Sequence, residues 1–416
     1  MEQNRANNKA GKWIGFIVLT IAAGLIYRVP YLKTVFYDPL VEEFGLSNTD
    51  VGKIMSAYSL TKTAIYIPGG ILADRFDNRK MLLASTALLA ACTFWYATIP
   101  SLGVLLLIHV LLAFSNVVFW VSFVKAIRMF GSSNEQGSVF GYSEGIRAVA
   151  GLIINFAALG ILNHFMTRSD APLRYVLIFY GLTYVVLGVA MWFLLPKESA
   201  DEKATVTSFK EYIEVLKVPG VWLVAVLVLC AYSCQIASEY TTTYLTTVFG
   251  MTVVMAGVVA TIRSYGIGIF SAPIIGKISD KVGSYSKTVI GLFICEIILA
   301  LILFFMPGTG GALIPAIITV LAFATVMYAL RGIYYATMGE AGIPLALTGT
   351  ATGIISVIGY LPDSYMNVML GNFMDKNPGA AGFKYVFGSI VVFAVIGIVL
   401  ALIIWKISKN VDQADE

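Results

Sequence analysis

Long apolar runs alternate with short polar segments along almost the whole chain. Twelve runs are long enough to cross a lipid bilayer, which takes about 20 residues each. They cover residues 13–36, 50–73, 81–99, 103–127, 138–163, 173–195, 220–246, 253–276, 287–306, 312–337, 346–372 and 384–407. Lipid offers backbone amides and carbonyls no hydrogen-bond partner, so each run is predicted to be helical. The pattern therefore predicts an all-α membrane protein with twelve transmembrane helices.

The polar segments divide the runs into two sets of six. The longest polar segment covers residues 196–219 and lies between the sixth and seventh runs. We therefore expect an N-terminal six-helix bundle at 1–195, a cytoplasmic linker loop at 196–219 and a C-terminal six-helix bundle at 220–416.

Composition and charge agree with a chain that faces lipid. Of its residues, 58% are hydrophobic and 12% are charged, whereas soluble domains carry about 25% charged residues. The net charge of +4 is spread over short loops and predicts no nucleic-acid partner. With a cytoplasmic N-terminus, 17 Lys and Arg residues lie on the inner side and six on the outer side. This excess of inner positive charge predicts a multi-pass protein of the cytoplasmic membrane with both termini in the cytoplasm.

One short motif occurs twice, each time between two apolar runs. The first copy, GILADRFDNRK, covers residues 70–80, and the second, GKISDKVGSYSK, covers residues 276–287. From Gly70 to Gly276 the offset is 206 residues. A repeat at this distance indicates a duplicated bundle. Two pseudo-symmetric halves of six helices are a transporter architecture, with the substrate site between the halves near the middle of the membrane.

These loops, the twelve runs and the central polar segment resemble the major facilitator superfamily over essentially the whole chain. The resemblance implies a secondary transporter without a cofactor, working as a monomer. It also implies that the two loops form a conformational latch. The latch residues would be Gly70, Asp74, Arg75, Arg79, Asp280 and Lys281. Asp77 stands where the family usually has glycine.

Ionisable residues inside the runs are the main functional candidates, because a charge in the bilayer is costly. The bases are Arg28, Lys62, Arg147, Arg263 and Arg331, and the acids are Glu144, Glu239, Glu296 and Asp363. Arg28 is flanked by tyrosines, and Lys62 lies about 18 Å above Asp74, near the midplane. We expect the substrate to contact Arg28, Tyr31, Lys62, Tyr66, Trp120, Gln235, Arg263, Arg331 and Tyr335. For proton coupling we expect Glu239, Asp363 and Glu144.

Several of these residues also fit structural interpretations. Arg263 could form a structural ion pair with Glu239, and Glu144 could pair along its helix with Arg147. Arg28 could extend to the outer interface. Glu296 ranks last among the acids, because the ninth helix of this family is usually peripheral.

The surplus of bases predicts transport of a small polar metabolite, most simply an anion such as a carboxylate, by rocker-switch alternating access. Protons or a counter-substrate would drive it, and membrane lipid would be its other partner. Proton-coupled drug efflux and neutral sugar symport are the alternatives, with a non-transporting membrane sensor as a different class. The sequence contains no Gly-x-x-x-x-Gly-Lys-Ser/Thr loop and no catalytic constellation, so we expect no enzyme. Its four cysteines lack zinc-site spacing, so we expect no metal.

Overall fold

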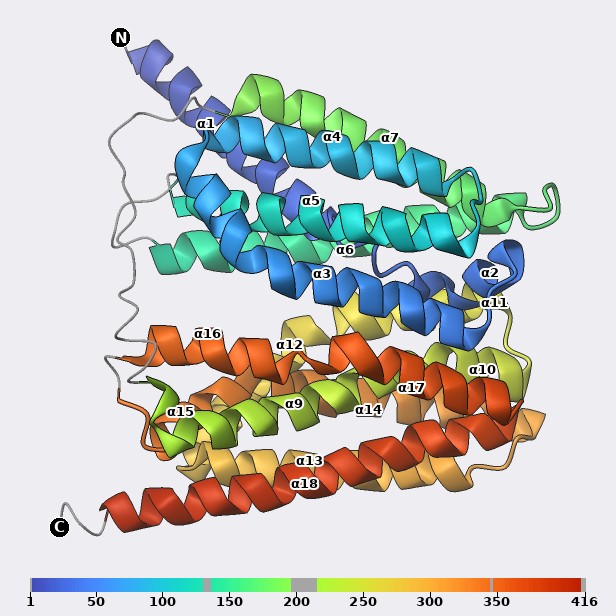
Figure 1. Cartoon of the computed structure of the whole chain (residues 1–416), viewed down its shortest axis with the longest axis vertical. Coiled ribbons are helices and arrows are strands. Elements are labelled where there is room, and N and C mark those ends of the chain that lie inside the picture. Colours follow the sequence, from blue (N-terminus) through green and yellow to red (C-terminus); the bar gives the residue numbers. More distant parts are fainter. Residues whose placement is uncertain (1, 129, 131–135, 196–214, 345–346, 413–416) are drawn as a thin grey trace. The chain divides into compact units, whose positions relative to one another are not determined.

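The computed structural model describes residues 2–128, 130, 136–195, 215–344 and 347–412. These residues form helices joined by short turns, and no strand occurs among them (Figure 1). By their contacts they belong to two compact units. The first unit holds Met1–Leu46 and Lys53–Ala204, and the second holds Ser47–Gly52 and Thr205–Glu416.

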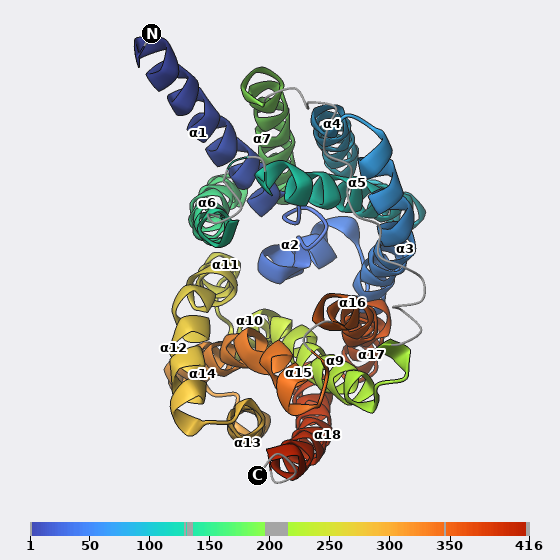
Figure 2. The ribbon, with the colours of Figure 1, turned by 90° about the vertical axis from the view of Figure 1, so that its left-hand side faces the viewer.

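The first unit is built from seven helices in the described part of the chain. They are α1 (Glu2–Leu25), α2 (Lys33–Phe44), α3 (Asn48–Arg75), α4 (Asn78–Tyr96), α5 (Leu102–Arg128), α6 (Gln136–Phe165) and α7 (Pro172–Leu194). Helix α4 packs against both α5 and α7, and α1 packs against α6 (Figure 2). Asp77 begins α4, since its carboxylate accepts a hydrogen bond from the N–H of Lys80 at 2.9 Å. An acid in place of the family's glycine is thus explained as a helix N-cap.

The second unit contains more and shorter elements. They are α9 (Pro219–Glu239), α10 (Thr241–Phe249), α11 (Val253–Thr261), the π-helix η1 (Ile262–Gly266), α12 (Gly268–Val282), α13 (Tyr285–Phe305), the 3₁₀ turn η2 (Gly310–Ala312), α14 (Leu313–Ile333), the 3₁₀ turn η3 (Tyr334–Ala336), α15 (Thr337–Glu340), α16 (Thr348–Gly359), α17 (Pro362–Lys376) and α18 (Ala380–Asp412). Figures 1 and 2 show α13 and α18 running side by side. Gly397 allows this close approach, because a Cβ there would lie 2.4 Å from the ring of Phe293.

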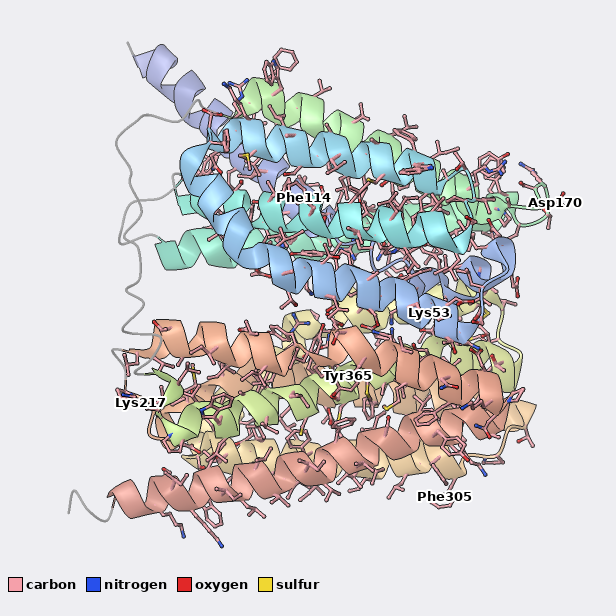
Figure 3. All side chains as sticks on the ribbon, viewed as in Figure 1. Lys53, Phe114, Asp170, Lys217, Phe305 and Tyr365 are labelled. Atoms are coloured by element: carbon pink, nitrogen blue, oxygen red, sulfur yellow. The ribbon has the colours of Figure 1, made fainter. Side chains whose placement is uncertain are left out.

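Each of the twelve predicted runs coincides with one helix or with consecutive helices. Within the described residues, seven helical segments are long and apolar enough to cross a membrane. The first, seventh, eighth, tenth and eleventh runs are interrupted, at α1/α2, α9/α10, α11/η1/α12, α14/η3/α15 and α16/α17. Apolar side chains stand outward along the helices, as Phe305 does at the end of α13 (Figure 3). This outward apolar surface suits lipid.

Candidate functional site

The break after α1 brings a group of aromatic residues together in the first unit. Helix α1 ends at Leu25, and the chain continues in turns before α2 begins at Lys33. Pro30 has no N–H to extend the helix. The terminal carbonyl of Leu25 accepts two hydrogen bonds, from the N–H of Arg28 at 2.9 Å and from the hydroxyl of Tyr184 on α7 at 2.8 Å. This bond holds the turn that carries Arg28 against the body of the unit.

Four rings form what we call the aromatic cluster: Tyr27, Tyr31, Tyr58 and Trp120. Ring centroids are 6.3 Å apart for Tyr27 and Tyr31, 5.4 Å for Tyr31 and Tyr58, and 6.2 Å for Tyr27 and Trp120. These spacings are typical of favourable edge-to-face contacts. The amide of Asn116 donates to the hydroxyl of Tyr58 at 2.9 Å and fixes that ring. The cluster therefore joins the turn after α1 to helices α3 and α5.

Basic side chains border the aromatic cluster. The ammonium of Lys62 lies 3.4 Å from the hydroxyl of Tyr31 and 5.7 Å from the ring centroid of Tyr58. The guanidinium of Arg147 lies 4.9 Å from the ring centroid of Trp120 and forms the expected ion pair with Glu144, at 2.5 Å. Arg28 is buried, at 7% exposure. Lysine, arginine and aromatic rings attract one another through cation–π contacts.

A second group, which we call the tyrosine cluster, lies in the second unit and contains Tyr232, Tyr334, Tyr335 and Tyr360. The hydroxyls of Tyr334 and Tyr360 are 3.3 Å apart, and the rings of Tyr232 and Tyr360 are 4.8 Å apart. Tyr335 shares a 2.7 Å hydrogen bond with the hydroxyl of Ser356 on α16. The break between α14 and η3 places Tyr334 and Tyr335 against the break between α16 and α17. Two broken helices therefore supply most of the cluster.

Arg331 and Asp363 supply the charges of the tyrosine cluster. Arg331 lies one turn before Tyr334, is exposed, and interacts electrostatically with Tyr334, Tyr328, Tyr232 and Tyr360. In the described part of the chain, the Arg331 side chain forms no ion pair and no hydrogen bond. Asp363 is 2% exposed and accepts a 2.9 Å hydrogen bond from the hydroxyl of Tyr232. It lies in the first turn of α17, where the helix dipole favours a negative charge.

The side chain of Arg263 is buried, unlike that of Arg331. It lies in the π-helix η1 and is 3% exposed. Its Nη1 donates to the carbonyls of Ser238 and Glu239, at 2.6 and 3.3 Å, and to the hydroxyl of Thr241 at 2.8 Å. These acceptors lie at the break between α9 and α10, where the last carbonyls of a helix lack partners within it. Arg263 thus clamps the broken seventh run, which corresponds in the second half to the broken first run.

The other expected site residues divide into two groups. Gln235 and Glu239 are partly exposed and share the face of α9 that carries Tyr232. Tyr66, Gly70, Asp74 and Arg75 lie within α3, but their side chains fall outside the described residues.

Of the other residues expected to form the latch, Asp280 and Lys281 are exposed and Arg79 is half-buried. Arg79 stacks on the ring of Trp192 at 4.9 Å, and Lys281 is exposed. Asp280 accepts a 3.0 Å hydrogen bond from the hydroxyl of Tyr285.

Two further acids bind helix N-termini in the second unit, and neither was predicted from the sequence. Glu340 accepts from the N–H groups of Tyr285 and Ser286 at the start of α13, at 2.5 and 2.9 Å. Asp375 accepts from the N–H groups of Asn48 and Thr49 at the start of α3, at 3.1 and 2.8 Å, and from both side chains. Neither acid has a local signal, because each bonds residues distant in sequence.

Comparison with known proteins extends this picture. Residues 13–364 match the sequence profile of the Major Facilitator Superfamily. The chain is 26% identical over 386 residues to the inner membrane protein YqcE of Escherichia coli (strain K12), covering 91% of each protein. It is 27% identical over 403 residues to the inner membrane protein YihN of the same organism, covering 95% of this chain and 96% of YihN.

Among solved structures, one similar fold is that of a bacterial homologue of the human lysosomal transporter Spinster, in an inward-facing and unoccupied conformation. It superposes with a TM-score of 0.76 at 16% identity, over 96% of this chain and 98% of that one. At this identity the likeness shows the fold alone. The predicted fold class of twelve helices in two six-helix bundles is thereby confirmed.

Proposed function

The chain belongs to the major facilitator superfamily of secondary transporters, and we propose that it moves a small organic anion, such as a carboxylate, by alternating access. It is a multi-pass membrane protein, and its relatives YqcE and YihN are inner membrane proteins. The observation that carries the anionic substrate is Arg331. An exposed guanidinium without an acidic partner in the described residues, surrounded by tyrosines, is equipped to bind a negatively charged solute.

The chemistry of the two clusters supports this proposal. A guanidinium presents several N–H donors in a planar fork that matches both oxygens of a carboxylate. The hydroxyls of Tyr335 and Tyr360 add donors that can turn toward a ligand. In the first unit, Arg28 and Lys62 lie next to tyrosines in the same way. Each half therefore offers basic groups beside aromatic hydroxyls, which suits a polar anion with an apolar portion.

Proton coupling is the second part of the proposal. Asp363 lies in the tyrosine cluster, Glu239 lies on the same helix face as Tyr232, and Glu144 pairs with Arg147 beside the aromatic cluster. A carboxyl group that exchanges a proton near a bound anion can couple the two movements. Exchange against a counter-substrate is the other driving force compatible with these groups.

Ligand screening followed by mutation tests the substrate class. The purified protein is screened by thermal shift against carboxylates, phosphorylated metabolites, sugars and apolar drugs, because a ligand stabilises the folded state to which it binds. We expect carboxylates to raise the melting temperature. Arg331→Ala should weaken that binding about 10-fold or more, the loss expected for a hydrogen bond to a charged group. Arg28→Ala should abolish uptake in proteoliposomes.

Lys406→Ala is the matched control, because Lys406 is an exposed base near the end of α18. It should bind and transport like the parent protein. Stabilisation by sugars alone, with unchanged binding in Arg331→Ala, would favour the neutral-sugar alternative. Stabilisation by many apolar drugs would favour efflux.

A further inference from the structure

Glu296 occupies an unusual environment in the middle of α13. Its side chain is 0% exposed, and neither carboxyl oxygen has a hydrogen-bond partner in the part of the chain that the structure describes. Buried polar groups in proteins are almost always hydrogen-bonded, so an exception of this kind requires an explanation. The aromatic cluster and the tyrosine cluster do not use this residue.

The surroundings of Glu296 within the second unit are apolar or weakly polar. Helix α13 packs against α18 and α14, and α18 packs against α9. The thiol of Cys234 on α9 lies beside the carboxyl of Glu296 and interacts with it electrostatically, and Cys230 lies one turn earlier on α9. The thiol of Cys234 donates its hydrogen bond to the carbonyl of Ile390, at 3.6 Å. Phe293 and Ala300 extend the same buried face of α13.

The charged groups on the neighbouring elements point elsewhere or lie near helix ends. Arg331 of α14 interacts with tyrosines, and Glu340 of α15 binds the first residues of α13. Glu239 of α9 is on the face of Tyr232, and Tyr334 of η3 bonds Tyr360. The others lie toward the ends of α12, α13 and α18: Lys277, Asp280, Lys281, Lys287, Lys384, Lys406 and Lys409. No cation among the described residues therefore compensates a charge on Glu296.

We propose that Glu296 is a proton-binding site inside the second unit, occupied by a proton in this conformation. An ionised carboxylate without a partner is so unfavourable in an apolar interior that the group takes up a proton and becomes neutral. The protonated acid fits the packing between α9, α13 and α18, whereas the carboxylate requires water. Release therefore needs a rearrangement that admits water. The O–H bond then breaks, its electron pair stays on the carboxylate oxygen, and the proton passes to water.

Helix α9 connects Glu296 to the tyrosine cluster. It carries Cys234 beside Glu296, and Gln235 and Glu239 on the face of the tyrosine cluster. A movement of α9 that accompanies substrate binding would change the hydration of Glu296. This coupling role rests on the proposed transport function, whereas the protonation of Glu296 does not.

Infrared spectroscopy of the full-length protein tests protonation. At about pH 7 an ordinary glutamate is ionised. The spectrum of the parent protein minus that of Glu296→Gln should contain the C=O stretch of a protonated carboxylic acid. Glu296→Asp, which keeps the carboxyl, should shift that band rather than remove it. Glu42→Gln is the control, because Glu42 is exposed and its removal should take away only carboxylate bands. A carboxylate signal at Glu296 would overturn the proposal.

Proteoliposomes test coupling. Glu296→Gln, a permanently neutral mimic of the protonated acid, should lose accumulation driven by a proton gradient by about 10-fold or more, the effect of about one unit of differential proton affinity. It should retain substrate exchange without a gradient. Unchanged gradient-driven accumulation would overturn the coupling role, and so would equal loss of exchange and accumulation. If the parent protein transports nothing, the proposed function fails, and the infrared band still decides whether Glu296 holds a proton.

Discussion

Individual tyrosine side chains stabilise the ends and breaks of helices in this protein. The hydroxyl of Tyr184 donates to the carbonyl of Leu25, the last residue of α1, and the hydroxyl of Tyr328 donates to the carbonyl of Ser264 in the π-helix, each at 2.8 Å. A tyrosine hydroxyl can donate or accept, and its ring covers apolar surface at the same time. This combination suits positions where a broken helix exposes backbone groups inside the membrane. The same property makes Tyr335 and Tyr360 suitable for contact with a substrate.

Glu43 is the residue for which a pH effect on stability is expected. Its Oε1 accepts the N–H of Leu173 at 2.6 Å, at the start of α7. Burial raises the pKa of Glu43 from 4.5 to about 7, although hydrogen bonds from Leu173 and Arg174 act in the opposite direction. The folded-state pKa is thus above the unfolded value. Stability from this group is complete below 4.5 and is lost as the pH rises to about 7.

The expected outcome is a melting temperature that falls between about pH 5 and pH 8, with a smaller slope in Glu43→Gln. Thermal unfolding of both proteins over this range measures it. Glu42→Gln, on the exposed neighbour, should keep the parent slope. An identical slope in Glu43→Gln and the parent would show that Glu43 does not titrate in this range.

At the scale of elements, interruptions coincide with the candidate site. The broken first run carries Arg28, and breaks in the tenth and eleventh runs bring Tyr334, Tyr335 and Asp363 together. The break in the seventh run is stabilised by Arg263, which donates hydrogen bonds to the carbonyls of Ser238 and Glu239 at the end of α9. A broken transmembrane helix is tolerated only when other groups satisfy its backbone. The hydrogen bonds of Arg263 therefore stabilise the break between α9 and α10.

Helix α3 is shared between the two units, because its first turn belongs to the second unit. Gly52 and Gly371 permit this packing, since a Cβ on either would lie within 3 Å of main-chain atoms of α17 or of Asn48. Burial alone would raise the pKa of Asp375, but hydrogen bonds from Thr49 and Asn48 outweigh it and lower the pKa. Asp375 is thus held as a carboxylate at a helix N-terminus, where negative charge is favoured.

Asp375→Asn should loosen the contact between Asp375 and the first turn of α3. Removing a charge-assisted cap costs about 1–2 kcal/mol, which corresponds to roughly 5–30-fold faster amide exchange at Asn48 and Thr49 if exchange follows local opening. Hydrogen–deuterium exchange of the region around residues 48–52 measures this directly. Lys376→Ala is the control, since it changes an exposed neighbour. Unchanged exchange in Asp375→Asn would exclude Asp375 as the group that holds this turn.

At the scale of the whole molecule, the proposed driving force is a proton gradient. An inside-alkaline gradient should increase substrate accumulation in proteoliposomes, and a protonophore should abolish the increase. Glu239→Gln should reduce the response, because Glu239 lies on the helix face of the tyrosine cluster. A potassium gradient with valinomycin controls for membrane voltage. Accumulation that ignores the protonophore but requires internal substrate would show exchange instead.

The twelve helices could be predicted from the sequence because the requirement behind them is local. An apolar run of sufficient length in lipid has to form its own backbone hydrogen bonds, wherever it sits in the fold. The duplication could also be predicted, because the two copies of the loop motif are visible in the sequence itself. The pairing of Glu144 with Arg147 was also predictable, because residues three apart share a helix face.

The roles of the individual charges could not be predicted, because they depend on residues far away in the chain. Arg263 and Arg331 look alike as isolated bases in apolar runs, but packing turns one toward the carbonyls at Ser238 and leaves the other exposed among tyrosines. Glu296 ranked last by its position, yet its burial without a partner makes it the acid with the strongest reason to hold a proton. By itself the sequence determined the membrane class, the number of helices and their duplication, since these follow from the local hydrogen-bonding demands of lipid. Only the tertiary structure decided which charges are satisfied and which are available, because that depends on side chains brought together by folding.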